Sequence, residues 1–203
     1  MKPHTIPLAL RGAVLAALLS LSGAQARADA VKLSIDPQHS TVGFRVRHLF
    51  TKVNGQFRGF EGSIEFDQKN LAASKVAVTI QASTIDTNVE ARDKDLRSPR
   101  FFDVAKYPTL SFTSTGIADV SGTRGRIKGT LTMHGVSREV VLDAEFLGSG
   151  KDPWGNQRFG FHGETKVNRK DFGMAWNEVI EAGGVLVGDE VEIVLDLEAV
   201  PGK

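Results

Sequence analysis

Hydrophobic and polar residues alternate along most of the chain from Thr41 onward, a pattern typical of β-strands with one buried face. In the first run, Val42, Phe44 and Val46 share one face and Arg45 lies on the other. Alternation favours antiparallel strands, because strands of a parallel sheet are covered on both faces and read as continuous apolar runs. About eight main strands are expected, around residues 41–48, 57–66, 76–80, 110–115, 127–133, 140–146, 159–167 and 191–197.

Eight antiparallel strands either stack as a sandwich or close as a barrel. Closure removes the exposed edges, and an eight-stranded barrel has an interior just wide enough for side chains or one elongated ligand. Small residues on the inward face leave room inside, although they equally fit strand twist or bulges; they are Gly129, Ala144 and Gly163. Glycine supplies the turns between strands, at Ser121-Gly122, residues 148–156 and Gly183-Gly184.

The segment from Thr84 to Phe112 interrupts this pattern and predicts one short helix. Thr87 and Glu90 have the spacing of a capping box, in which each side chain bonds the backbone amide of the other residue. Pro99 disfavours the helical conformation in Ser98, so the helix should end there. The pattern therefore predicts about three helical turns between these two signals.

The inward face of this helix is expected to carry a charged pair. Val89 and Leu96 fall on one face, and Arg92 and Asp93 lie between them, while Glu90 pairs with Lys94 on the solvent side. Aromatic residues follow at once in a segment that is mostly loop, and they predict a lid on a hollow barrel. These are Phe101, Phe102, Tyr107 and Phe112.

The first 28 residues read as a secretory signal peptide, with residues 29–203 forming one domain. Basic residues precede an apolar run at 13–21, which is too short to span a bilayer, and Ala26-Arg27-Ala28 offers an A-x-A cleavage site. Removing this segment takes three of the 25 basic residues and no acid, which leaves 22 against 24 acidic residues and a net charge of −2. We therefore expect a periplasmic protein that does not bind nucleic acid.

Chemistry for catalysis is sparse in this sequence. It contains no G-x-S-x-G, P-loop, H-E-x-x-H or EF-hand pattern, and its histidines lack the spacing that would bring two imidazoles to one metal. We expect no metal site, no cofactor and no catalytic residues. The alternative is an enzyme acting on a lipid-like or isoprenoid substrate, which would need a nucleophile or an acid and a base converging in the lumen.

Ordered motifs along nearly the whole chain resemble the YceI-like proteins. They run from Arg92-Asp93 through Leu131-Thr132-Met133-His134-Gly135-Val136 and Asp152-Pro153-Trp154-Gly155 to Lys170-Asp171-Phe172. The resemblance implies a secreted, lipocalin-like antiparallel barrel that holds a polyisoprenoid, such as a polyprenyl phosphate or an isoprenoid quinone, or a similar amphipathic lipid in its lumen. It implies neither catalytic residues nor a metal, and it fixes the ligand less securely than the fold.

We expect lumen and mouth residues from several strands and from the lid to bind this lipid. Arg92 and Asp93 are the candidates for a headgroup contact, against the alternative that they form an ion pair that closes the lid or caps a neighbouring strand. Contact with a membrane should be transient, and the oligomeric state stays open, a homodimer included. The full set is Phe44, Val46, His48, Arg92, Asp93, Phe101, Phe102, Phe112, Met133, Phe146, Phe161 and Trp176.

A third, weaker reading is a stress-associated interaction module whose barrel is solidly packed. The volume of the lumen separates this reading from a carrier.

Overall fold

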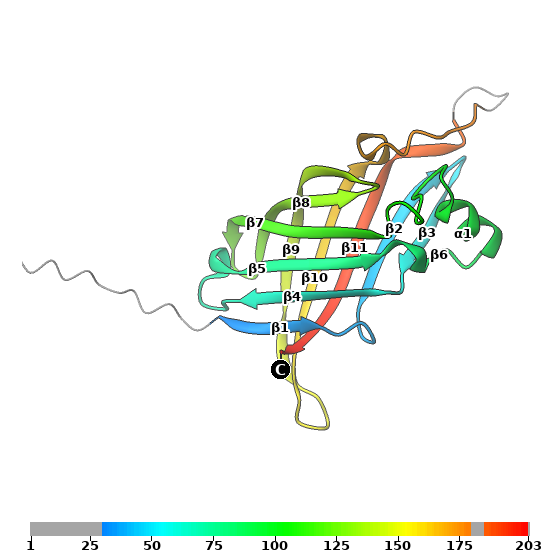
Figure 1. Ribbon diagram of the computed structural model, residues 1–203. Coiled ribbons are helices and arrows are strands. Elements are labelled where there is room, and N and C mark those ends of the chain that lie inside the picture. The colour runs from blue at the N-terminus through cyan, green and yellow to red at the C-terminus, as the bar shows by residue number, and fades with distance from the viewer. Residues whose placement is uncertain (1–29, 180–184, 203) are drawn as a thin grey trace, which may run out of the picture.

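The computed structural model describes residues 30–179 and 185–202, so the expected signal peptide and the expected turn at Gly183-Gly184 lie outside the described residues. The described chain is dominated by one antiparallel sheet that curls into a barrel (Figure 1). Its strands are β1 Val31–Ile35, β2 Thr41–His48, β3 Thr51–Phe57, β4 Phe60–Phe66, β5 Lys75–Gln81, β6 Ile85–Asp86, β7 Thr109–Ser121, β8 Arg124–Met133, β9 Val136–Lys151, β10 Gln157–Asn168 and β11 Val187–Pro201.

These eleven segments make up eight strands, three of which are interrupted. β1 and β2 lie one after the other along β11, because β1 pairs with residues 199–201 and β2 pairs with residues 187–196. In the same way, β4 pairs with β1 and β3 pairs with β2. On the next strand, β5 pairs with β4 and β6 pairs with β3. The pairing of β1 with β11 closes the ring. The predicted closed eight-stranded antiparallel barrel is therefore confirmed.

The strand β1, which with β2 forms one strand of the barrel, was not predicted from the sequence, where the alternation was followed only from Thr41. β1 has only five residues, of which Leu33 and Ile35 are buried, so its alternation is too short to stand out. It nevertheless pairs on both sides, with β4 and with β11. Without this short strand the barrel would have two open edges.

The helix α1 Glu90–Arg97 ends before Ser98, as predicted, but the predicted start is wrong. The capping box does not form, because the Thr87 side chain donates to Asp93 instead, and Val89 takes the N-cap position without a side-chain hydrogen bond. Eight residues make about two turns. Val89 is 45 % exposed and does not face inward, and Glu90 lies 3.6 Å from Arg97 rather than pairing with Lys94.

The two ends of the barrel differ. We call the end that carries α1 the helix end, and the end that carries the protruding turn between β9 and β10 the hairpin end (Figure 1). At the helix end, residues 87–108 join β6 to β7, and residues 169–179 follow β10 and begin with a short 3-10 helix, η3 Arg169–Phe172. Two further 3-10 turns, η1 Leu71–Ala73 and η2 Ala82–Thr84, flank β5. No helix among the described residues is long and apolar enough to cross a membrane.

Candidate ligand-binding cavity

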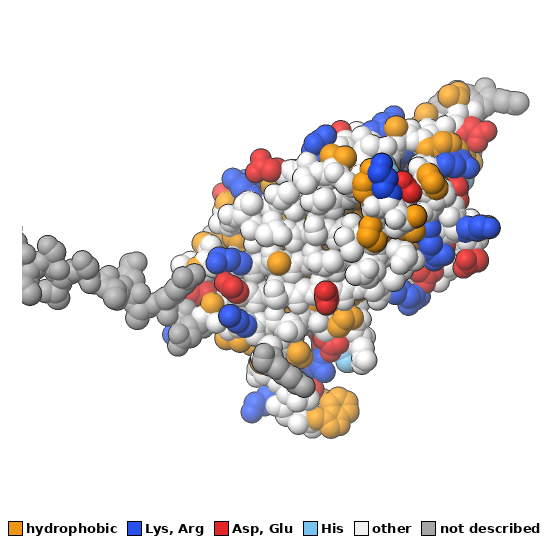
Figure 2. All heavy atoms as spheres, viewed as in Figure 1, with side chains coloured by type: hydrophobic (Ala, Val, Ile, Leu, Met, Phe, Trp, Pro, Cys, Tyr) orange, Lys and Arg blue, Asp and Glu red, His pale blue; other side chains and the backbone are white. Residues whose placement is uncertain are grey.

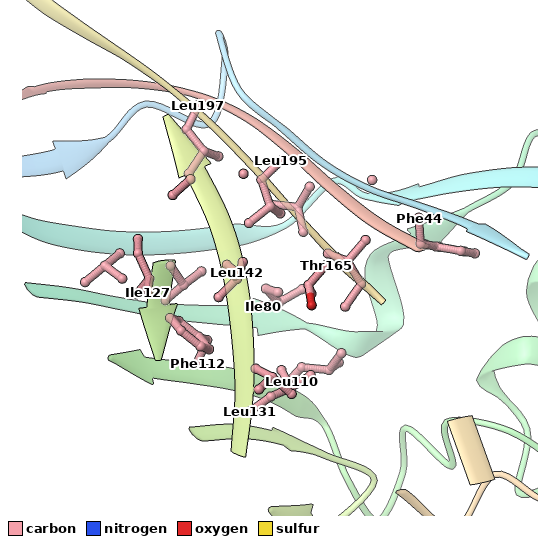
Figure 3. A pocket seen from close by; sticks show the side chains of 18 of the residues that line it. Phe44, Ile80, Leu110, Phe112, Ile127, Leu131, Leu142, Thr165, Leu195 and Leu197 are labelled. Carbon is pink, nitrogen blue, oxygen red and sulfur yellow. The ribbon is translucent and has the colours of Figure 1, made fainter. Parts of the chain in front are cut away.

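The interior of the barrel contains a cavity of about 270 Å³. This volume approaches the lower end of the range of small-molecule sites, about 300 Å³. Apolar side chains from strands far apart in sequence point into it from all sides (Figure 3). The residues labelled there are Phe44, Ile80, Leu110, Phe112, Ile127, Leu131, Leu142, Thr165, Leu195 and Leu197.

The cavity is long because alternation continues without a break along its walls. On β11 the lining residues are Val191, Ile193, Leu195 and Leu197, every second position. Six residue steps at about 3.4 Å give a wall of about 20 Å, which exceeds the roughly 15 Å of hydrocarbon in one bilayer leaflet. A modest volume spread along such a length suits a single extended chain.

A cluster of four phenylalanines closes the cavity toward the hairpin end. The Phe66 ring lies 4.8 Å from that of Phe146, 5.2 Å from that of Phe161 and 6.0 Å from that of Phe159, measured between centroids. Phe146 and Phe161 also contact each other, with their centroids 5.5 Å apart. Tilted and edge-on contacts of this kind stabilise one another beyond the area they bury.

Phe101 and Phe102, two of the four aromatic residues predicted as a lid, cover the helix end. Of the other two, Phe112 lies in the barrel wall on β7 and Tyr107 packs against the His134 ring at 4.6 Å. Phe102 packs edge-on against Phe57 at 5.6 Å, and Phe57 in turn contacts Phe44 at 5.8 Å. Phe101 is buried and packs edge-on against Trp176 at 5.2 Å. The lid thus joins the wall of β2 and β3 to the segment that precedes β11.

The helix itself is fastened to the broken strand beside it. Arg97 donates from Nε to the carbonyl of Ser83 and from Nη2 to the carbonyl of Ile85, both at 2.9 Å. The backbone amides of Phe102 and Val104 then donate to Leu96 and Arg97 carbonyls. These bonds hold Phe101 and Phe102 in place over the cavity.

Glycine at one wall position makes room for a ring rather than for a ligand. A Cβ at Gly129 would lie 2.4 Å from the Phe112 ring and 2.6 Å from the carbonyl oxygen of Thr113. The edge of the Phe112 ring therefore lies against β8 at Gly129. Ala144 and Gly163, by contrast, line the cavity, and a Cβ at Gly163 would make only ordinary contacts.

Eight of the twelve expected ligand-binding residues lie around the cavity, and four do not. His48 is at the end of β2, beside the turn, and Trp176 lies behind Phe101, where the Arg100 guanidinium covers it at 4.1 Å from the ring centroid. Arg92 and Asp93 belong to a separate network. Those around the cavity are Phe44, Val46, Phe101, Phe102, Phe112, Met133, Phe146 and Phe161.

Arg92 and Asp93 both bind Thr87, the residue that follows β6. Asp93 is buried and accepts from the Thr87 backbone amide at 2.9 Å and from its hydroxyl at 2.5 Å. Arg92 donates from Nε to the Thr87 hydroxyl and from Nη2 to its carbonyl, at 2.8 and 2.9 Å. Each side chain thus bonds Thr87 rather than the other, so this geometry favours a structural role in the lid, although not through the mutual ion pair expected from the sequence.

Replacing Arg92 by alanine is expected to weaken the retention of every lipid alike and to lower the melting temperature. The change removes two hydrogen bonds to Thr87, at about 1 kcal/mol each. A charged-headgroup lipid and an uncharged hydrocarbon of equal tail length should therefore be lost in proportion, in a retention assay at matched stability. A loss confined to the lipid with the charged headgroup would show that Arg92 binds the headgroup.

Arg169, which the sequence analysis did not single out, is a buried cation at the edge of the cavity. It is 4 % exposed and donates to the carbonyls of Gly188, Met174 and Trp176 at 2.5–2.9 Å, with a weaker bond to Val187. Burial lowers the pKa of this guanidinium, and Asp189, at 3.2 Å, opposes that shift. Arg169 therefore ties the segment after β10 to the start of β11.

The charged side chains along the cavity wall all have partners. Lys75 lies 3.4 Å from Glu65, Glu145 lies 3.1 Å from Arg124, and the His162 ring lies 2.8 Å from Asp196. Within the described part of the chain, no three His, Asp or Glu side chains gather in an arrangement that could hold a metal ion. The lumen offers a ligand tail apolar contact and little else.

A network of charges ties the hairpin end to the first turn of the barrel. Arg158 on β10 contacts Asp36 at 2.5 Å, Asp152 at 3.3 Å and Glu198 at 3.4 Å. Burial raises the pKa of Asp36, but hydrogen bonds from His39 and Arg158 outweigh it and lower the pKa to about 2. The ionised carboxylate is thus the form that the fold prefers.

We expect the barrel to lose stability as the pH falls from about 4 to about 2. The folded-state pKa of Asp36 lies below its ordinary value of 3.8, so its contribution is present above that value and disappears as the carboxylate is protonated in the fold. The shift corresponds to about 2 kcal/mol. The unfolding free energy, measured with urea at several pH values in this range, should fall less steeply with decreasing pH in Asp36→Asn than in the unaltered protein. Equal pH dependence in the two proteins would contradict the assignment.

Comparisons with known proteins agree with this architecture. The model of the YceI-like domain family matches residues 33–199. Protein YceI of Salmonella arizonae is 41 % identical over 195 residues, which cover 96 % of this chain and 98 % of that protein, and Protein YceI of Salmonella enteritidis matches equally well.

Solved structures show the same fold. BcnA of Burkholderia cenocepacia superposes with a TM-score of 0.73 at 23 % identity, over 82 % of this chain and 99 % of that one. The YCEI protein of Campylobacter jejuni gives 0.67 at 31 % identity, over 77 % and 90 %. A polyisoprenoid binding domain from Saccharophagus degradans, implicated in plant cell wall breakdown, gives 0.62 at 16 % identity, over 85 % and 99 %. On the family match and the identity to its relatives, this chain belongs to the YceI-like family.

Proposed function

We propose that this protein is an exported carrier that holds the tail of a long-chain amphipathic lipid in its barrel, most suitably a polyisoprenoid such as a polyprenyl phosphate or an isoprenoid quinone. The long apolar cavity carries this proposal. The polyisoprenoid-binding domain of the same fold supports the class of ligand. An enzyme would need acid, base or nucleophile side chains free to act in the lumen, and each charged residue on its wall is paired with a residue outside it.

The free energy of tail burial is not what limits binding; the limiting property is selectivity among lipids. A tail of about ten buried carbons would gain about 8 kcal/mol at roughly 0.8 kcal/mol per carbon, which alone corresponds to micromolar binding. The competitor is the bilayer, whose hydrocarbon resembles the lumen, so transfer between the two is nearly neutral. Tail length and shape, matched to the lumen, then decide which lipid is retained.

Entry at the helix end fits the architecture. There the helix and the aromatic lid cover the gap between β6 and β7, which no strand pairing bridges among the described residues, whereas the phenylalanine cluster packs at the hairpin end. Segments outside the sheet open at lower free energy than paired strands. We therefore place the tail toward the phenylalanines and the headgroup at the lid.

A series of isoprenoids of increasing length tests this function. Delipidated protein is loaded with isoprenyl alcohols from two to ten units and passed through a gel-filtration column. Retention should rise with length until the lumen is filled and then level off, because further units stay outside. No retention of any member, or equal retention of the shortest and the longest, would contradict a lumen site.

Export is tested separately by the intact mass of the protein in its own host. The expected chain begins at Asp29, after the Ala26-Arg27-Ala28 site, with Ala30 as the other start because Ala28-Asp29-Ala30 is a second small-residue frame. Recovery of the uncleaved chain from the cytoplasm would contradict export.

A further inference from the structure

The tip of the β2–β3 hairpin carries an exposed phenylalanine where hairpin chemistry calls for glycine or asparagine. β2 and β3 pair up to His48 and Thr51, so only Leu49 and Phe50 form the turn. Leu49 has φ of 51°, a left-handed conformation that is strained for a bulky residue. Phe50 is 86 % exposed. Local folding does not explain either residue.

Further apolar side chains lie beside this tip. The Leu49 amide donates to the carbonyl of Leu186 at 3.0 Å, which brings the tip against the start of β11. Val185 next to it is 47 % exposed, and Val179, which forms a β-bridge with Val185, is 81 % exposed. In Figure 2 hydrophobic side chains gather at the helix end, while the face over β4, β5 and β7 shows almost none. The hydrophobic tip is thus Phe50, Val179 and Val185.

All the charged side chains of the β2–β3 hairpin behind this tip are basic. Residues 41–58 contain four basic residues and no Asp or Glu. Arg47 and Lys52 stand directly opposite each other in the register, an arrangement that costs stability because like charges repel. Lys52 is partly compensated by Glu192 at 2.6 Å, whereas Arg47 has no ion-pair partner among the residues that the structure describes. The four are Arg45, Arg47, Lys52 and Arg58.

We propose that the β2–β3 hairpin, at the helix end, docks the protein on an anionic phospholipid bilayer, with Phe50 inserted among the acyl chains and Arg47 and Lys52 at the phosphates. An apolar tip backed by cations is the arrangement that binds anionic membrane surfaces. The same end holds the aromatic lid and the mouth of the cavity, whose wall reaches Val46 on β2 and Val187 on β11. This inference rests on the proposed carrier function, because docking there sets the mouth of the lumen against the membrane.

Vesicle flotation tests the proposal with the chain from Asp29 onward. Vesicles of phosphatidylethanolamine and phosphatidylglycerol should carry the protein, and vesicles of phosphatidylcholine alone should carry much less. Phe50→Ser should weaken binding by about tenfold or more, and Arg47→Ala by roughly fivefold. High salt should reduce binding in the unaltered protein and less so in Arg47→Ala.

Trp154→Ser is the matched control, because Trp154 is an equally exposed aromatic residue, 82 % exposed, at the hairpin end. It should bind vesicles as the unaltered protein does. The proposal is overturned if the unaltered protein does not float, if Phe50→Ser floats equally well, if Trp154→Ser is the variant that loses binding, or if Phe50→Ser instead dissociates a dimer of this chain.

Isoprenoid retention, measured on the same variants without vesicles, separates the two proposals. Phe50→Ser should retain lipid normally. Normal retention without any vesicle binding would overturn docking alone, whereas vesicle binding without retention would overturn the carrier function.

Discussion

Phe112→Asp is expected to abolish lipid retention and to destabilise the barrel by at least about 3 kcal/mol. Phe112 lies in the middle of the cavity wall, with its ring over Gly129. The substitution removes a large apolar surface and places a carboxylate where no partner can reach it. Urea unfolding measures the loss of stability, and gel filtration with a bound isoprenoid measures the loss of retention.

Thr113→Asp is the matched control, one residue further along β7. Its side chain is exposed on the outer face of the sheet. The same carboxylate there should change the unfolding free energy by less than about 0.5 kcal/mol. Equal tolerance at both positions would mean that the two faces of β7 have been assigned the wrong way round.

Arg169→Met is expected to lower the free energy of unfolding by about 3–5 kcal/mol, the usual effect of removing one partner from a buried charge network. Methionine fills much of the space, but the carbonyls of Met174, Trp176 and Gly188 lose their donor. The segment between β10 and β11 should then detach from the barrel. Thermal unfolding and hydrogen exchange at the amides of residues 174–177 measure both effects.

The neighbouring Lys170→Met should cost less than about 1 kcal/mol, because its ion pair with Asp189 is at the surface. A similar loss of stability in both variants would show that Arg169 stabilises the protein through its ion pair with Asp189 rather than through its hydrogen bonds to the carbonyls.

The walls of the barrel were predictable because one face of every long strand is buried. A shift of one residue would turn the whole apolar set outward, so the alternation at Val191, Ile193, Leu195 and Leu197 fixes both face and register. The breaks in three strands were not predictable, because each depends on which neighbour pairs with the next segment. Asp36-Pro37 signals a turn between Ile35 and Thr41, but a turn signal does not show that both segments pair with the same strand, β11.

The polar contacts were predicted less well, because spacing along the chain does not identify partners in space. Thr87 and Glu90 fit a capping box, yet Asp93, three residues beyond Glu90, takes the threonine hydroxyl. Arg169 stands among exposed charged residues, and nothing local marks it as buried. Its partners are backbone carbonyls, which any sequence would provide.

The most direct measurement of the central claim is native mass spectrometry of the protein purified from the exported fraction of its own host. The carrier account predicts a complex heavier than the processed chain by the mass of one long-chain lipid, which is released on collisional activation and is absent from Phe112→Asp. Recovery of the unaltered protein only as the bare chain, with no lipid in its solvent extract, would contradict it.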